Sequence, residues 1–328
     1  MKILIILLTT VGLMNSTWGQ SSVTDNSNNS CRVRLGIVDS GLTSSNHLPT
    51  SATVTTFTKS AATRLQSVDW TSRYGYSHGE EIALAASNRL ARLSSKCSLD
   101  IYVVNPFVVV RGRSANGWRT HGGRQLEQLG VDYGTLERGL AWLSEQAVTT
   151  VVVPWGTKAS PASKRTFALA EALGLQIVAS QPNDVERAKS GWVYPADYDS
   201  TIAVSASGSR YPAANLLSIF DSTDFFANGI SRIGVQGSSF AAAEVGAVIA
   251  YGDSLLGTGN GLRMAELLSK PDSLSIEGES RSAAVLPDHI ADSEMQQVLL
   301  SVLAQQPPAV VSLQGRDTAF ATRLEPSL

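Results

Sequence analysis

The sequence predicts an α/β fold, a doubly wound, mainly parallel sheet with helices on both faces. Short runs rich in β-branched residues alternate along the chain with longer segments of helical period. The strand runs are apolar throughout, which is typical of parallel strands that are covered on both faces. At 328 residues, of which 43% are hydrophobic, the chain is long enough to bury a large core.

Each predicted strand is a short run built mainly on valine, isoleucine, leucine and threonine. The six strands expected are 32–38, 53–57, 100–105, 149–153, 175–180 and 201–205. The predicted helices are longer, with apolar residues spaced three or four apart. They are expected at 79–94, 134–147, 161–173, 239–251 and 293–305.

The N-terminus has the pattern of a secretory signal peptide, predicted over residues 1–19. Lys2 precedes an apolar stretch over 3–14, and Thr17 and Gly19 place small residues at the −3 and −1 positions of a cleavage site. The apolar stretch is too short to span a bilayer after processing, so we expect a secreted or periplasmic protein without a membrane contact. An uncleaved anchor is the alternative.

The remaining chain divides by composition into a linker, one domain and a tail. Residues 20–31 are rich in serine and asparagine and predict a flexible linker, 32–305 hold the periodic pattern, and 306–328 lose it. Within the domain, the polar and glycine-rich stretch 111–132 predicts a surface loop. The net charge of −2 and the lack of a basic run argue against nucleic-acid binding.

The two cysteines each precede a predicted strand. Cys31 lies just before the run at 32–38 and Cys97 just before the run at 100–105. If these strands are parallel neighbours, both sulfur atoms lie at one edge of the sheet, where a disulfide can form. Two free, buried thiols are the alternative.

Three residues that carry chemistry fall at element boundaries. Asp39 ends the first predicted strand, whereas His78 and Ser239 stand at the starts of two predicted helices. Sites in parallel sheets form at such boundaries, so an acid, a base and a hydroxyl would meet at one rim. Taken singly, the residues could be a turn aspartate, a surface histidine and a helix cap. Their order along the chain matches one of the convergent serine-nucleophile triads.

At these motifs the chain resembles the subtilisin-like serine peptidases. The family shows Asp-Ser-Gly or Asp-Thr-Gly, then His-Gly-Thr-His-Val-Ala, then Gly-Thr-Ser-Met-Ala. The corresponding segments here are Asp39-Ser40-Gly41, His78-Gly79-Glu80-Glu81-Ile82-Ala83 and Gly237-Ser238-Ser239-Phe240-Ala241. The resemblance covers about residues 32–252 and implies the subtilisin-like form of the predicted fold, with a peptidase domain over 32–305.

The resemblance implies an exported serine endopeptidase that cleaves polypeptides through an acyl-enzyme. Ser239 would attack, His78 would move the proton, and Asp39 would orient the imidazole. Asn183 takes the place of the family's oxyanion donor, with Gln181 as the alternative. No cofactor is expected and no metal-ligand cluster stands out. Structural calcium is common in the family, but the sequence does not place it, and it does not indicate the oligomeric state.

The resemblance also implies a substrate pocket. Trp155 and Gly156 occupy the position of the family's edge segment, which pairs with substrate and forms a wall of the main specificity pocket. Val193 stands where many relatives have a small residue at the pocket floor. With Pro182 on one side, the pocket would be shallow and would favour small or medium residues before the scissile bond. Alternatively, Trp155 turns into the core.

The second motif departs from the family at Glu80 and Glu81. Acidic residues suit the first turn of a helix, but a carboxylate near His78 would favour the protonated imidazole and weaken it as a base. We expect both to face solvent. Two rival functions stay open, a weakly active or inactive binding or scaffold protein with this fold, and an esterase or acyl-transfer enzyme that uses the same triad.

Overall fold

The computed structural model describes the central part of the chain. The described residues are 31–42, 47–57, 77–110, 118–119, 128–183, 185–207, 222–231, 234, 236–276 and 279–305. All of them belong to one compact unit that begins at Cys31. The predicted signal peptide, the linker up to residue 30 and the tail from 306 lie outside the described residues, so those boundaries stay predictions.

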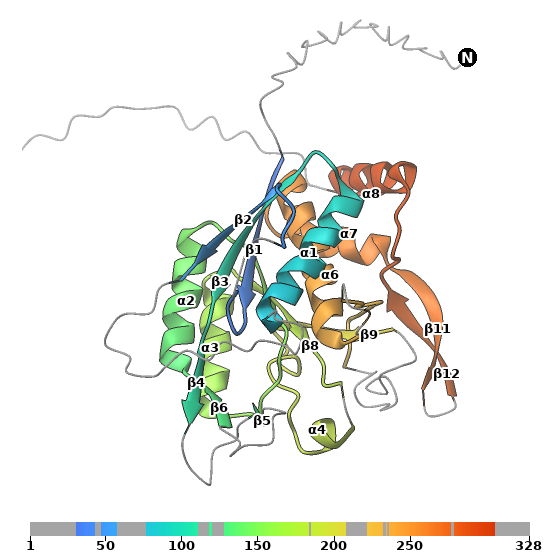
Figure 1. The fold of residues 1–328 in the computed structure, drawn as a ribbon. Helices are drawn as coiled ribbons and strands as arrows, with labels where there is room; N and C mark the ends of the chain where they lie inside the picture. Colours follow the sequence, from blue (N-terminus) through green and yellow to red (C-terminus); the bar gives the residue numbers. More distant parts are fainter. Residues whose placement is uncertain are drawn as a thin grey trace, which may run out of the picture. The chain divides into compact units, whose positions relative to one another are not determined.

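The described residues form a nine-stranded sheet in the order β11-β12-β10-β9-β8-β7-β1-β3-β2 (Figure 1). Every pair of neighbours is parallel except β11 and β12, so the predicted α/β class with a mainly parallel sheet is confirmed. The strands are β1 (Arg32–Val38), β2 (Ala52–Thr56), β3 (Ser98–Val104), β7 (Thr150–Val153), β8 (Gln176–Ser180), β9 (Thr201–Ala206), β10 (Phe225–Ala227), β11 (Lys270–Ile276) and β12 (Glu279–Val285).

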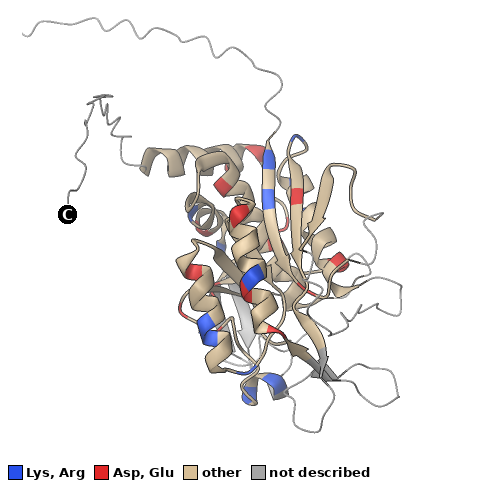
Figure 2. Cartoon of the chain, turned by 90° about the vertical axis from the view of Figure 1, so that its left-hand side faces the viewer, with Lys and Arg blue, Asp and Glu red and all other residues tan. Residues whose placement is uncertain are grey.

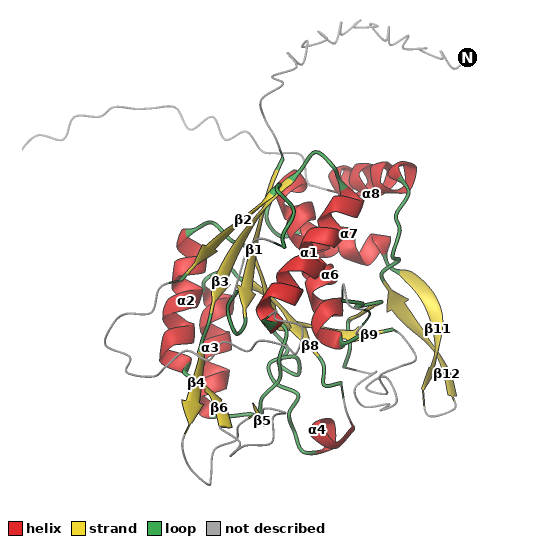
Figure 3. Ribbon diagram, viewed as in Figure 1, coloured by secondary structure: helices red, strands yellow, loops and turns green. Residues whose placement is uncertain are grey.

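Helices cover both faces of the sheet, with α2 and α3 on one face and α1, α6 and α7 on the other (Figure 3). All five predicted helices are present within a few residues of their expected bounds, and the described residues form two further helices, both short. The helices are α1 (His78–Leu93), α2 (Tyr133–Glu145), α3 (Pro161–Ala172), α4 (Val185–Lys189), α6 (Ser238–Leu256), α7 (Asn260–Leu268) and α8 (Asp292–Gln305).

Alternate residues of the central strands pack into two hydrophobic cores, one on each face of the sheet. In β7, Val152 packs in the core under α1 and α6, whereas Val151 and Val153 pack in the core under α2 and α3. All three are fully buried, which explains why the parallel strands read as continuous apolar runs. The central helix α6 lies very close to the sheet, because a Cβ added to Gly246 would lie only 2.4 Å from Val152 Cγ2.

Helix α6 is also apolar and long enough, by length and composition, to cross a membrane. Its residues from Ser238 to Asp253 are nevertheless all buried against the sheet and the neighbouring helices. It is therefore the core helix of this fold, and its alanine and glycine residues serve close packing.

The prediction of a surface loop over 111–132 is wrong in part. A small antiparallel sheet in the order β4-β6-β5 is formed by β4 (Phe107–Val110), β5 (Trp118–Arg119) and β6 (Gln128–Val131). Strand β6 pairs with β4. The apolar run of β4 supplies the partner edge, so the polar composition of 111–132 does not predict that a strand forms there. Short strands of this kind depend on pairing with a distant segment rather than on their own composition.

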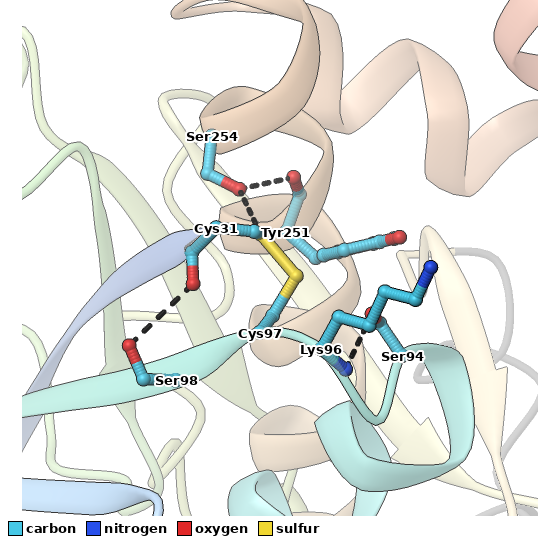
Figure 4. The surroundings of a disulfide bond; sticks show 7 residues. All are labelled: Cys31, Ser94, Lys96, Cys97, Ser98, Tyr251 and Ser254. Carbon is cyan, nitrogen blue, oxygen red and sulfur yellow. Dashed lines mark hydrogen bonds between the residues drawn. A yellow bond between two sulfur atoms is a disulfide. The ribbon is translucent and has the colours of Figure 1, made fainter. Parts of the chain in front are cut away.

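The predicted disulfide between Cys31 and Cys97 is present, with their Cα atoms 4.5 Å apart (Figure 4). Strands β1 and β3 pair in parallel with Arg32 opposite Ser98, so the residues that precede them lie side by side. The disulfide lies near the C-terminal turn of α6, where Ser254 Oγ is 3.9 Å from Cys31 Sγ. It therefore links the amino ends of β1 and β3, at the opposite end of these strands from Asp39.

Replacing both cysteines by serine should lower the free energy of unfolding by about 2–5 kcal/mol, since the crosslink restricts the unfolded chain. Urea unfolding followed by circular dichroism measures the difference. Ser254→Ala serves as the control and should leave the midpoint nearly unchanged. An oxidised wild type that unfolds at the same urea concentration as the double variant would contradict a stabilising crosslink.

Candidate active site

The turn after β1 holds the predicted acid. Asp39 continues the parallel ladder, with its backbone N–H donating to the carbonyl oxygen of Val104 at 3.0 Å. Its Oδ1 accepts from both the backbone N–H and the hydroxyl of Ser40, at 2.5 and 2.9 Å. Asp39 is buried, so these two hydrogen bonds hold the carboxylate in a single orientation.

The amino end of α1 docks directly on this turn. The Ser77 hydroxyl caps the helix by accepting from Glu80 N–H at 3.1 Å, and it donates to the carbonyl oxygen of Gly41 at 2.6 Å. Gly79 faces the same carbonyl, and a Cβ added there would lie 2.6 Å from Gly41 O. The second residue of the His-Gly motif must therefore be small for the helix to come this close.

This docking brings the predicted base to the acid. His78 Nδ1 lies 2.7 Å from Asp39 Oδ2. Burial of His78 opposes the charged imidazole, but the charge and hydrogen bond of Asp39, with a smaller contribution from Glu81, outweigh it and raise the pKa of His78. Asp39 therefore favours the tautomer with its proton on Nδ1, which leaves Nε2 free to accept a proton.

The predicted nucleophile lies in the first turn of α6. Ser239 follows the cap residue Gly237, and the Phe240 ring packs 6.2 Å from the His78 ring, centroid to centroid. The Ser239 hydroxyl donates to the carbonyl oxygen of Pro154 at 2.9 Å. The structure thus brings all three predicted residues to one rim of the sheet, but a rotation about the Ser239 side chain is needed before its hydroxyl can donate to His78.

Asn183 lies beside the nucleophile, at the carboxyl end of β8. Its Oδ1 accepts from the backbone N–H of Ser238 at 2.8 Å, so the amide group has its Nδ2 amino group left as a donor. The alternative donor, Gln181, is held elsewhere, because its Nε2 donates to the carbonyl and hydroxyl oxygens of Ser222 at 3.4 and 3.2 Å. The arrangement favours Asn183 as the oxyanion donor.

The three residues and Asn183 line one cavity of about 150 Å³. Of the predicted pocket residues, Trp155 and Gly156 line it. Val193 does not belong to the lining, whereas its neighbour Trp192 does, so the prediction of Val193 as the pocket floor is not borne out. The remaining lining residues are Ser40, Phe107, Pro154, Ser180, Gln181, Pro182 and Arg187.

Trp155 is chiefly a core residue, which was the alternative reading of its position. It is 3% exposed, its Nε1 donates to the carbonyl oxygen of Val38 at 2.7 Å, and its ring meets that of Phe107 edge-on at 5.5 Å. It supports the turn beneath Asp39 and presents only part of its surface to the cavity.

The expectation that both acidic residues of the second motif face solvent is wrong. Glu80 is 1% exposed and one of its carboxylate oxygens lies 3.8 Å from His47 Nε2. Glu81 is partly buried, and its Oε1 is enclosed without a hydrogen-bond partner. Burial raises the pKa of Glu81, whereas the charge of His78 opposes the rise. The close docking of α1 on the 39–41 turn leaves little room for these side chains to reach water.

A partly buried ionic cluster links the two helices that carry His78 and Ser239. Glu244 of α6 lies 3.6 Å from Arg92 Nη2 of α1, and the buried Arg89 donates to the carbonyl oxygen of Asp288 at 2.9 Å. Burial lowers the pKa of Arg89 to about 10, while the charge of Glu244 opposes the change. These contacts hold α1 and α6 against each other behind the site.

Among the residues that the structure describes, no group of three or more His, Cys, Asp or Glu side chains could hold a metal ion.

Comparison with known proteins reveals similarity in structure. No family model and no curated protein matches the chain. The A-subunit of the AB5 toxin from E. coli is 16% identical, with a TM-score of 0.50 over 82% of this chain and 93% of that one. A mutant of the protease domain of PatA is 15% identical, with a TM-score of 0.48 over 82% and 95%. A cold-adapted subtilisin-like serine proteinase is 14% identical, with a TM-score of 0.47 over 79% and 89%.

At these identities the likeness concerns the fold alone. The chain has a doubly wound, mainly parallel α/β fold, with a nine-stranded sheet and helices on both faces.

Replacing Glu81 by glutamine should lower the pKa of His78, because the variant removes a negative charge that stabilises the imidazolium. The base would then be neutral at lower pH. The pH dependence of the rate of ester hydrolysis measures this, and its acid limb should move to lower pH. Glu171→Gln on the exposed face of α3 is the control. An acid limb that stays in place, or moves to higher pH, would contradict an electrostatic contact between Glu81 and His78.

Proposed function

We propose that this protein is an exported serine endopeptidase that hydrolyses peptide bonds through an acyl-enzyme. One observation carries the proposal: the 2.7 Å contact between His78 Nδ1 and Asp39 Oδ2 lies in a cavity that Ser239 and Asn183 also line. An oriented imidazole, a hydroxyl and an amide donor in one cavity are the parts that acyl transfer needs.

In the first half of the reaction, the Ser239 hydroxyl rotates from Pro154 to His78 and attacks the carbonyl carbon of the scissile peptide bond. The Oγ–C bond forms as the Oγ proton passes to Nε2 of His78. The C–N bond then breaks, and the same proton leaves with the amine product. Asp39 stabilises the transient imidazolium and stays ionised throughout.

In the second half, water replaces the amine. His78 takes a proton from the water, whose oxygen bonds to the acyl carbon, and the proton returns to Ser239 Oγ as the ester bond breaks. The products are a carboxylic acid and the free enzyme, so protons and bonds balance without a cofactor.

The oxygen that becomes negative in each half needs hydrogen-bond donors. Asn183 Nδ2 supplies one. The backbone N–H of Ser239 supplies another, since the N–H groups of its neighbours Ser238 and Phe240 donate to Asn183 Oδ1 and Gly237 O. The positive end of the α6 dipole acts in the same direction. Removing a single donor of this kind costs about 10²–10³ in kcat, a magnitude established on subtilisin itself.

An extended polypeptide fits the walls of the site. The segment after β7 pairs with the segment before the cis Tyr194–Pro195 bond, since Thr157 N–H donates to Tyr194 O at 2.6 Å and Tyr194 N–H donates back at 3.1 Å. A peptide that pairs as an added strand beside the Pro154–Gly156 segment, which lines the cavity together with Ser239, would bring its carbonyl to Ser239. The Cys31–Cys97 disulfide supports export, because such bonds persist in oxidising compartments.

The rival function, a binding or scaffold protein with this fold, draws on a specific observation. The Ser239 hydroxyl donates to the carbonyl oxygen of Pro154 rather than to the imidazole, so in this structure His78 does not activate it. Catalytic hydrogen bonds are often formed only when substrate is present, so this geometry is also compatible with an active enzyme.

A fluorophosphonate probe should label the purified protein at Ser239, because phosphonylation requires a hydroxyl that is activated by a neighbouring base. Labelling should be lost in Ser239→Ala and strongly reduced in His78→Ala. Mass spectrometry of the labelled peptide identifies the modified residue.

The matched control is Ser238→Ala, which removes the neighbouring hydroxyl and should still label. A folded wild type that never labels would favour the binding protein. Labelling together with hydrolysis of small esters, but of no peptide or protein substrate, would instead favour an esterase.

A further inference from the structure

A cation lines the catalytic cavity. Among the described lining residues, those that are charged or titratable are Asp39, His78 and Arg187. Asp39 is committed to His78 and Ser40, so the charge that these described residues add outside the proposed triad is the guanidinium of Arg187 in α4. Figure 2 shows the cations of α4 in blue at the lower edge of the view.

The chain holds Arg187 at the cavity through a compact turn. The carbonyl oxygen of Arg187 accepts from the Trp192 backbone N–H and from the Ser190 hydroxyl, each at 3.0 Å. Gly191 N–H donates to Ala188 O at 2.9 Å, and the φ of +80° at Gly191 closes the turn. Arg187 and Trp192 therefore reach the cavity as one unit.

This unit packs on the segment that would pair with substrate. A Cβ added to Gly156 would lie 2.7 Å from the carbonyl oxygen of Trp192, so the two walls touch at this point. Asn183, the proposed oxyanion donor, precedes Arg187 by four residues. Arg187 and Trp192 therefore line the cavity beside the segment that would pair with substrate.

The rest of that wall is apolar. Trp155, Pro182 and Trp192 contribute surface that suits the methylene groups of a side chain but offers no charge. An arginine in the lining of such a cavity pairs best with a carboxylate, which its planar guanidinium can bind through two hydrogen bonds.

We propose that Arg187 makes the pocket selective for an acidic residue, glutamate or aspartate, immediately before the scissile bond. The inference rests on the proposed function for the register of the substrate, but recognition of the acidic side chain does not require chemistry. It differs from the earlier expectation of small or medium residues, which was based on a shallow pocket formed by Trp155, Val193 and Pro182.

The size of the preference follows from the exposure of Arg187. A hydrogen bond to a charged group discriminates strongly when it is buried, but Arg187 is exposed and solvent screens its charge. We therefore expect glutamate to be preferred over its neutral isostere glutamine by about tenfold at low salt. Because the charge is exposed, added salt should reduce the ratio.

Peptide binding to the Ser239→Ala protein tests the proposal without depending on catalysis. Two peptide amides that differ only in a C-terminal Glu or Gln are compared by calorimetry at low salt. The Glu peptide should bind about tenfold more tightly. Arg187→Gln should abolish the difference, and Arg187→Glu should reverse it in favour of a peptide that ends in Lys. Lys189→Gln removes the other cation of α4, which does not line the cavity, and should keep the preference.

Equal affinities for the two peptides, a preference for Glu that survives Arg187→Gln, or no binding of either peptide would each overturn the proposal. The failure of the proposed function looks different. A wild type that no fluorophosphonate labels, but that still binds the Glu peptide through Arg187, would retain the acidic pocket and lose the peptidase.

Discussion

The docking of α1 on the turn after β1 is the contact on which the site depends. The Ser77 hydroxyl reaches the carbonyl of Gly41, and the absence of a side chain at Gly79 lets the helix come close enough for His78 to meet Asp39. The acid Asp39 follows a strand of the sheet and the base His78 begins the helix, so the two side chains meet only through this contact. Close packing of α6 on the same sheet then brings Ser239 to the same rim.

The fold was largely predictable because its strands are parallel and buried on both faces. Such strands are continuous apolar runs, so those centred on Ile37, Val152 and Val178 are visible in the sequence. The antiparallel pairs were not predicted. Strands β5 and β6 lie in a polar stretch, and β11 and β12 pair mainly with each other, so their formation depends on a partner edge rather than on their own composition.

The residues of the site divide in the same way. Asp39, His78 and Ser239 were predictable because motifs and element boundaries mark them. Glu80 and Val193 were not, since the docking of α1 buries the first, and the cavity is lined by Trp192 and not by the second. Arg187 carries no motif at all; its place in the cavity follows from the turn that closes α4, which spacing along the chain does not reveal.

A mutant cycle measures most directly whether the three residues act as one unit. Asp39→Asn, His78→Ala and Ser239→Ala, singly and in all combinations, are compared by the rate of peptide hydrolysis, with folding checked by circular dichroism. If the triad operates as described, His78→Ala and Ser239→Ala each lower kcat about as much as the double variant does, because the loss of either disables the same proton transfer. Losses that multiply from one variant to the next would show that the three side chains act independently and would contradict the account.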